Sequence, residues 1–258
     1  MSSALHAEWT KLRSVAGNAW LMIGAIAHAV ALSGVAVAAE HYSPGGSPVD
    51  ITRLSLVGID LAQALIVILA VHAMCGEYSS GMIRITLTAL PRRLTVLAAK
   101  AATVCLVALF AGAIAVLGCL LVGRLVLPSH GFTSVHGYAL LSLAHTPTLR
   151  AAVGTVLYLA LIALLSLGIA AAVRDSAAAV GLVLGLLYCF PIVAALVGDP
   201  RWQHRLERLG PMTAGLSVQA TTDLRSLPIG PWTGLGVLAA WAGAALLLGG
   251  LLLIVRDA

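Results

Sequence analysis

The polar side chains inside the apolar stretches are the first candidates for chemistry in this 258-residue sequence. Asp60 and Gln63 lie three residues apart in one such stretch, so they share one face of a helix. An ionisable group in hydrocarbon costs several kcal/mol unless it is paired or hydrated. We therefore expect both side chains to face the inside of a helix bundle. There they would either line a translocation pathway or form hydrogen bonds between helices.

No other residue pattern indicates catalysis or a metal site. His130, His136 and His145 are spaced by six and nine residues, which fits no pair of ligands on a helix. The four cysteines form no C-x-x-C pair, and neither H-E-x-x-H nor G-x-S-x-G occurs. We therefore expect no catalytic residues and no metal in this chain.

A phosphate-binding loop is also absent. The only lysines are Lys11 and Lys100, and neither follows a glycine, so the G-x-x-x-x-G-K-[ST] pattern does not occur. The chain is therefore not expected to hydrolyse ATP or to be an enzyme, and no cofactor is expected in it.

The composition predicts an all-α polytopic membrane protein. The sequence is 60% hydrophobic and 10% charged, with a mean hydropathy of +1.01, whereas soluble domains carry about 25% charged residues. A membrane-spanning helix needs about 20 mostly apolar residues. Six windows meet this length and indicate one transmembrane domain over residues 1–258: 20–39, 54–75, 101–123, 151–173, 177–197 and 232–255.

Two short amphipathic helices are expected outside the spans. Near the N-terminus, Trp9 recurs with Leu5 and Leu12 at helical spacing, next to Lys11 and Arg13. This pattern favours a helix lying in the membrane interface over a frayed terminus. After the fifth span, an outer helix is expected over 201–209, where Trp202, Leu206 and Leu209 alternate with Arg201, Arg205 and Arg208.

The basic residues indicate which side faces the cytoplasm. With an even number of spans, both termini lie on one side, which carries eight of the 15 basic residues. Positive charge next to the first span has the strongest influence on orientation, and Lys11 and Arg13 lie there. We therefore expect both termini in the cytoplasm of a multi-pass cell-membrane protein. Lipid headgroups are a sufficient partner for the net charge of +5, and no nucleic acid is expected.

A polar segment, residues 76–93, separates the second and third spans. Ser79 or Ser80 can cap a helix, Ile83 and Leu87 share one face of it, and Pro91 ends it. This pattern predicts a short amphipathic helix at the membrane surface. Such a helix would either dock another protein or lie on lipid as a linker.

Several motifs resemble one family. The sequences of residues 8–14 (EWTKLRS), 77–84 (EYSSGMIR) and 90–93 (LPRR) are similar to those of bacterial ABC exporter permeases of the ABC type 2 family. The short loop at 173–176 and the last span, followed by Arg256, Asp257 and Ala258, also fit this family. The likeness extends over nearly the whole chain.

The resemblance implies a six-span permease that works as a homodimer or pseudo-dimer with separate ABC ATPase subunits, which bind ATP and Mg²⁺. It also implies that the N-terminal stretch is an interfacial helix and that the polar segment is a coupling helix seated in a groove of the ATPase. The residues expected to dock the ATPase are then Glu77, Tyr78, Ser80, Ile83, Arg84 and Leu87.

The function expected from this resemblance is outward movement of a substrate by alternating access. An ATP-independent secondary transporter, or another polytopic membrane protein, is the alternative. The substrate is not indicated, because one scaffold serves many substrates.

Overall fold

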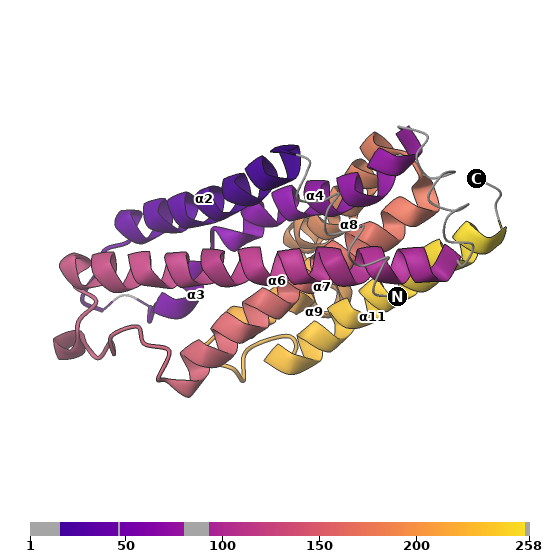
Figure 1. Cartoon of the computed structure of the whole chain (residues 1–258). Helices are drawn as coiled ribbons and strands as arrows, with labels where there is room; N and C mark the ends of the chain where they lie inside the picture. Colours follow the sequence, from indigo (N-terminus) through magenta and orange to yellow (C-terminus); the bar gives the residue numbers. More distant parts are fainter. Residues whose placement is uncertain (1–15, 46, 80–92, 256–258) are drawn as a thin grey trace.

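The computed structural model describes residues 16–45, 47–79 and 93–255, and all regular elements in these ranges are helices (Figure 1). Six long helices run side by side and confirm the prediction of an all-α protein with six apolar spans. They are α2 (Ala16–Ala39), α4 (Ile59–Ser79), α6 (Arg93–Val126), α7 (Thr146–Val173), α8 (Ser176–Leu196) and α11 (Pro231–Val255). The shorter elements are α3 (Ile51–Leu56), η1 (Leu127–His130), η2 (Ser134–His136), α9 (Pro200–Leu209), α10 (Pro211–Leu216) and η3 (Ser217–Gln219).

The bundle has two ends that differ in what they carry. We call the end where α4 finishes and α6 begins the polar-segment end, because residues 80–92 connect these helices. The other end, called the loop end, carries the connections after α2, after α6 and before α11. The predicted interfacial helix with Trp9, Lys11 and Arg13 and most of the predicted coupling helix lie outside the described residues.

The second predicted span is interrupted near the loop end. The window 54–75 consists of the end of α3, a break at Val57–Gly58, and most of α4. At the break the backbone of Gly58 lies against α2, where its N–H donates to Ser33 Oγ at 3.1 Å. A Cβ on Gly58 would clash with the carbonyl oxygen of Ala29. Only glycine permits this approach, and the hydroxyl of Ser33 satisfies an N–H group that the break leaves free.

Helix α7 occupies the centre of the bundle and packs against α4, α6, α8 and α11. Its closest partner is α11, and glycines allow this contact. A Cβ on Gly168 would lie 2.5 Å from the backbone of Ala245 and Leu246, and a Cβ on Gly249 would lie 2.5 Å from the carbonyl oxygen of Gly168. The two backbones therefore touch, as small residues allow in membrane helices.

The connection between α8 and α11 folds back along α7. Gly215 packs against Tyr158 and Val218 against Gly154, and Arg150 donates to the carbonyl oxygen of Ala220 at 2.5 Å. Along these contacts, the residue numbers on α7 decrease while those in the connection increase. Helix α10 and η3 therefore run antiparallel to α7, toward the loop end, and are mostly buried.

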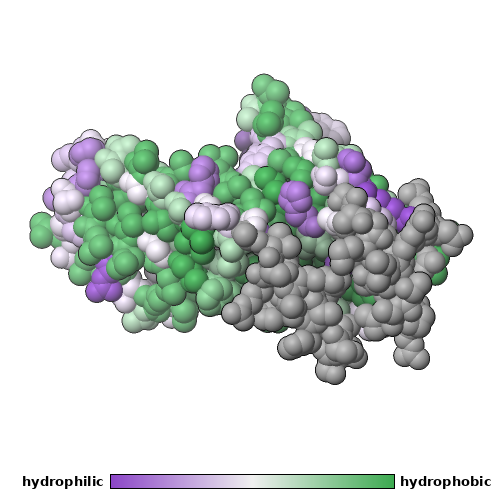
Figure 2. All heavy atoms as spheres, turned by 45° about the horizontal axis from the view of Figure 1, so that its top comes forward, coloured by the Kyte–Doolittle hydropathy of each residue, from purple (hydrophilic) through white to green (hydrophobic). Residues whose placement is uncertain are grey.

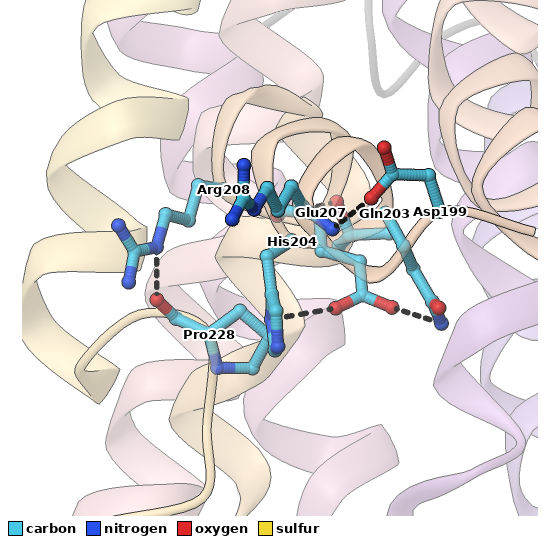
Figure 3. A network of polar contacts seen from close by, with 8 residues as sticks. Asp199, Gln203, His204, Glu207, Arg208 and Pro228 are labelled. Atoms are coloured by element: carbon cyan, nitrogen blue, oxygen red, sulfur yellow. Dashed lines mark hydrogen bonds and ion pairs between the residues drawn. The ribbon is translucent and has the colours of Figure 1, made fainter. Parts of the chain in front are cut away.

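Helix α9 confirms the predicted amphipathic helix over 201–209, and most of its side chains are exposed. Asp199 caps it by accepting from the N–H of Arg201 at 2.8 Å. Figure 3 shows Glu207 between Gln203, whose amide nitrogen lies at 3.2 Å, and His204, at 3.9 Å, while Arg208 donates to the carbonyl oxygen of Pro228. These contacts hold the polar face of α9 and tether it to the segment before α11.

Apolar side chains dominate the outside of the bundle as well as its core. Figure 2 shows apolar residues over much of the visible face, with polar residues in smaller patches among them. Exposed large apolar residues occur along most of the long helices, for example Phe110 on α6 and Leu247 on α11. A surface of this kind suits contact with lipid, as in a multi-pass membrane protein.

Candidate functional site

The two polar residues predicted in the second span meet side chains from three other helices. Gln63 is fully buried on α4, and its Oε1 accepts a hydrogen bond from the hydroxyl of Tyr158 on α7. Its Nε2 lies 3.3 Å from the hydroxyl of Tyr188 on α8 and 3.2 Å from Sδ of Met212 on α10. We call Asp60, Gln63, Tyr158, Tyr188 and Met212 the polar cluster.

Asp60 lies in the first turn of α4, directly after the break in the second span. Its carbonyl oxygen accepts from Nε2 of Gln63 at 2.8 Å and from the hydroxyl of Tyr188 at 2.7 Å. Its carboxylate is less fully hydrogen-bonded, since Oδ1 is buried without a hydrogen-bond partner. The positive end of the helix dipole favours a negative charge in this first turn.

The two predicted pathway residues differ in how far their hydrogen-bonding capacity is used. Gln63 has its polar atoms satisfied inside one copy of the chain, which is the arrangement of an interhelical hydrogen bond. Asp60 keeps an unused acceptor, so it is the member of the pair that has capacity to interact with something else. Nothing in the sequence indicates that Tyr158, Tyr188 and Met212 join them, because apolar spans with single polar residues do not reveal their partners.

A second group of contacts lies at the polar-segment end, where α4 finishes. The guanidinium of Arg174, between α7 and α8, lies over the ring of Tyr78, with its Cζ 5.4 Å from the ring centroid. Nη2 of Arg174 also donates to the carbonyl oxygen of Leu252 on α11 at 3.2 Å. Arg174 adopts a left-handed backbone conformation with φ 63°. One side chain thus joins α4 and α11 at the connection between α7 and α8.

Lys100 reinforces the same end of α4. A lysine next to the predicted third span, 101–123, would ordinarily extend to the lipid headgroups. Instead α6 begins seven residues earlier, at Arg93, so Lys100 lies within the helix and is 2% exposed. Its Nζ donates to the carbonyl oxygen of Ala73 on α4 at 3.1 Å. This carbonyl gives the buried ammonium group a hydrogen-bond partner inside the bundle.

Most of the residues predicted to dock the ATPase have no described side-chain contacts. Ser80, Ile83, Arg84 and Leu87 lie outside the described residues, and the backbone of Glu77 belongs to the last turn of α4. Tyr78 is the one whose side chain is described, and it lies under Arg174. Its contact with Arg174 was not expected from the sequence, because residues 78 and 174 are far apart in the chain.

A third polar contact closes the loop end. Asp50 caps α3 and accepts from the N–H and hydroxyl of Thr221 at 2.5 and 2.7 Å and from the N–H of Thr222 at 3.0 Å. Burial alone would raise the pKa of Asp50. The hydrogen bonds from Thr221, Arg53 and Thr222 outweigh that effect and hold the pKa below its ordinary value of 3.8.

Within the described ranges, no three histidine, cysteine, aspartate or glutamate side chains lie close enough together to hold a metal ion. The four cysteines are free thiols. The described histidine, cysteine and acidic side chains therefore add no metal or disulfide site to the polar contacts above.

Comparison with known proteins identifies the family. Residues 4–192 match the family model described as ABC-2 family transporter protein. This range includes the polar segment, most of the polar cluster and the spans up to most of α8. No curated protein matches the chain. Because the match covers well over half of a chain with six candidate spans, the chain belongs to the ABC-2 family of transporter membrane proteins.

Proposed function

We propose that this chain is the membrane-spanning subunit of an ATP-driven exporter in the bacterial plasma membrane, powered by a separate ABC ATPase. Both termini and the polar segment would then lie in the cytoplasm. The family match over residues 4–192 carries the proposal, since ABC-2 membrane components have no ATPase domain of their own. The chain would bind no cofactor, while ATP and Mg²⁺ would be held by its partner.

The proposed mechanism is alternating access driven through the polar segment. Closure of the ATPase dimer on ATP would push this segment, and the push would pass into α4, which it directly follows. The contacts of Tyr78 with Arg174, and of Arg174 with Leu252, support a route from α4 to α11. Such contacts favour movement of the helices as one rigid group over bending of α4 alone.

The working unit would contain two copies of this chain or a pseudo-dimer with a related one. The exposed apolar surface of α8, which includes Leu182, Ile192 and Leu196, supports a further protein or lipid contact there. The substrate would cross between the two copies, and Asp60 remains the proposed polar residue of that pathway, with Gln63 holding the helices around it.

Docking through the polar segment is tested by reversing its charge. The chain is co-expressed with its ABC ATPase subunit, and the ATPase is recovered on the tagged permease in detergent. Arg84→Glu, or acidic residues in place of Ile83 and Leu87, should lower the recovered ATPase about tenfold, which corresponds to about 1.4 kcal/mol.

Arg201→Glu is the matched control, because it makes the same charge reversal on α9, which is not part of the polar segment. Membrane insertion and the amount of permease should be unchanged in all variants. Equal ATPase recovery by the Arg84 and Arg201 variants would count against docking at the polar segment. Substrate movement by the chain alone in liposomes, without an ATPase or ATP, would instead favour a secondary transporter.

A further inference from the structure

A cavity of about 680 Å³ opens at the loop end, beyond the ends of the spans. Its walls come from the connection after α2, from α3, from the segment between η1 and α7, from the start of α7 and from Thr221 and Thr222. Binding sites for small organic molecules commonly enclose about 300–1,000 Å³. The cavity therefore has the size of a ligand site, and it lies at the opposite end of the bundle from the polar segment.

The ionisable side chains of the described lining include one carboxylate, that of Glu40, and three imidazoles, those of His41, His136 and His145. Glu40 is the only acidic residue in the lining, and no lysine or arginine is found there among the described residues. Glu40 makes no hydrogen bond or ion pair with other residues that the structure describes. The nearby carboxylate of Asp50, by contrast, is occupied by the threonines. Glu40 is therefore a carboxylate available to a ligand, in a lining that has no lysine or arginine to attract an anion.

Aromatic side chains form one wall of the cavity. The ring of Tyr42 stacks on His136 with centroids 4.1 Å apart, and it meets Phe132 and Tyr138 edge to face at 6.3 and 6.2 Å. The hydroxyl of Tyr138 accepts from the N–H of Val49 at 3.3 Å, which ties this wall to the segment before α3. Aromatic rings attract cations and apolar groups, and this wall is already held in place before anything binds.

These features favour one class of ligand. An inorganic cation would need several oxygen or nitrogen ligands, but the lining has one carboxylate, and no described group of three metal-ligating side chains occurs. An anion would find no lysine or arginine in the lining. A monovalent organic cation would match both the single carboxylate and the aromatic wall.

We propose that the loop-end cavity binds a monovalent organic cation with an aromatic or apolar body, with Glu40 as its counter-ion and the wall around Tyr42 as its apolar contact. The proposal concerns binding by this chain alone and does not depend on an ATPase or on the direction of transport.

The test uses two probes of nearly the same shape and opposite charge, tetraphenylphosphonium and tetraphenylborate. Binding of each to the purified full chain in detergent is measured by equilibrium dialysis, with protein-free micelles subtracted. Tetraphenylphosphonium should bind saturably at one site per chain, and tetraphenylborate should not. Because Glu40 is partly exposed, Glu40→Gln should weaken tetraphenylphosphonium binding about three- to fivefold, as loss of a solvent-screened ion pair does.

A second substitution tests the cavity rather than the charge. Ala139 lines the cavity, whereas Ala144 lies in the same connection outside the lining, and both are exposed. Ala139→Trp should reduce tetraphenylphosphonium binding at least tenfold by filling the site, while Ala144→Trp should leave it unchanged. Glu207→Gln on α9 is the matched control for Glu40→Gln.

Equal binding of the two probes by the wild-type chain would overturn the proposal. Unchanged affinity in both the Glu40 and Ala139 variants would overturn it as well, and unfolding is checked by size-exclusion profiles of each variant. Loss of tetraphenylphosphonium binding in the Glu40 and Ala139 variants, with normal ATPase recovery, would support the cavity independently of the polar segment. Normal probe binding with no ATPase recovery would contradict the proposed function alone.

Discussion

The contact between α7 and α11 makes a sharp prediction about two glycines on these helices. Gly168→Ala would place a methyl group 2.5 Å from the backbone carbon of Ala245 and the backbone nitrogen of Leu246. Backbone atoms cannot rotate away, so the helices must separate. Gly243, on the opposing helix α11, has nothing within 4 Å of the position that a methyl group would take there, and it provides the matched control.

The expected free energies have opposite signs. Forcing an extra methyl group into a close-packed interior costs about 1–3 kcal/mol, and the clash at Gly168 falls toward the upper part of that range because it involves backbone. Alanine in place of glycine within a helix stabilises by about 0.5–1 kcal/mol, since glycine loses more conformational freedom on folding. Gly168→Ala should therefore destabilise by about 2 kcal/mol, whereas Gly243→Ala should stabilise slightly.

Thermal unfolding of the purified variants in one detergent, followed by fluorescence-detected size exclusion, measures the difference. In soluble proteins of similar length, 1 kcal/mol shifts Tm by roughly 2–4 °C, so the two variants should differ by roughly 5–10 °C. Equal Tm values for the Gly168 and Gly243 variants would refute the close backbone contact between α7 and α11.

Three further predictions concern the polar contacts. Arg174→Ala removes the contact with Tyr78 and a charged hydrogen bond, so it should lower stability by about 1–2 kcal/mol and reduce substrate-stimulated ATP hydrolysis while ATPase recovery in the pull-down stays normal. Tyr158→Phe leaves the carbonyl of buried Gln63 without its donor and should cost about 1–3 kcal/mol in thermal unfolding, whereas a change within experimental error would contradict the polar cluster. Asp50→Asn should lower Tm at pH 7; because the folded-state pKa of Asp50 lies below 3.8, its contribution is complete above that value and is lost as pH falls below it. The Tm gap between wild type and Asp50→Asn should therefore stay constant from pH 7 to about pH 5 and shrink only below about pH 4.

Much of the fold could be predicted because the bilayer imposes it. The length and composition of the apolar stretches located all six spans, and the final span, predicted over 232–255, is the helix Pro231–Val255. The amphipathic helix over 201–209 was equally clear, because its apolar and basic residues alternate at helical spacing. Local sequence decides both features, so no knowledge of tertiary contacts was needed.

The breaks and ends of helices could not be predicted in the same way. The second span is interrupted at Gly58 because α2 approaches it there, and the sequence does not show which helix will cross. Proline removes a backbone hydrogen bond and often ends a helix, yet α8 continues past Pro191 to Leu196. Apolar surroundings leave a helix few alternatives, because a backbone group released from it would find no water to bind.

The partners of single polar residues also escaped prediction. Asp60 and Gln63 could be identified as unusual in a span, but the residues that meet them come from α7, α8 and α10. Lys100 shows the same difficulty, since its orientation depends on how far α6 extends and on the nearness of α4. In the described residues, the polar chemistry of the bundle is therefore decided by tertiary packing.

The hydrogen bonds of Asp50 restrict how the bundle could deform. They fasten the entrance of the second span to the chain just before the sixth, so these two segments of the molecule start from a common anchor at the loop end. Swinging about that anchor keeps all three bonds, whereas prying the two apart there must rupture every one of them. A movement imposed at the polar-segment end would therefore turn these two segments about a fixed point at the loop end.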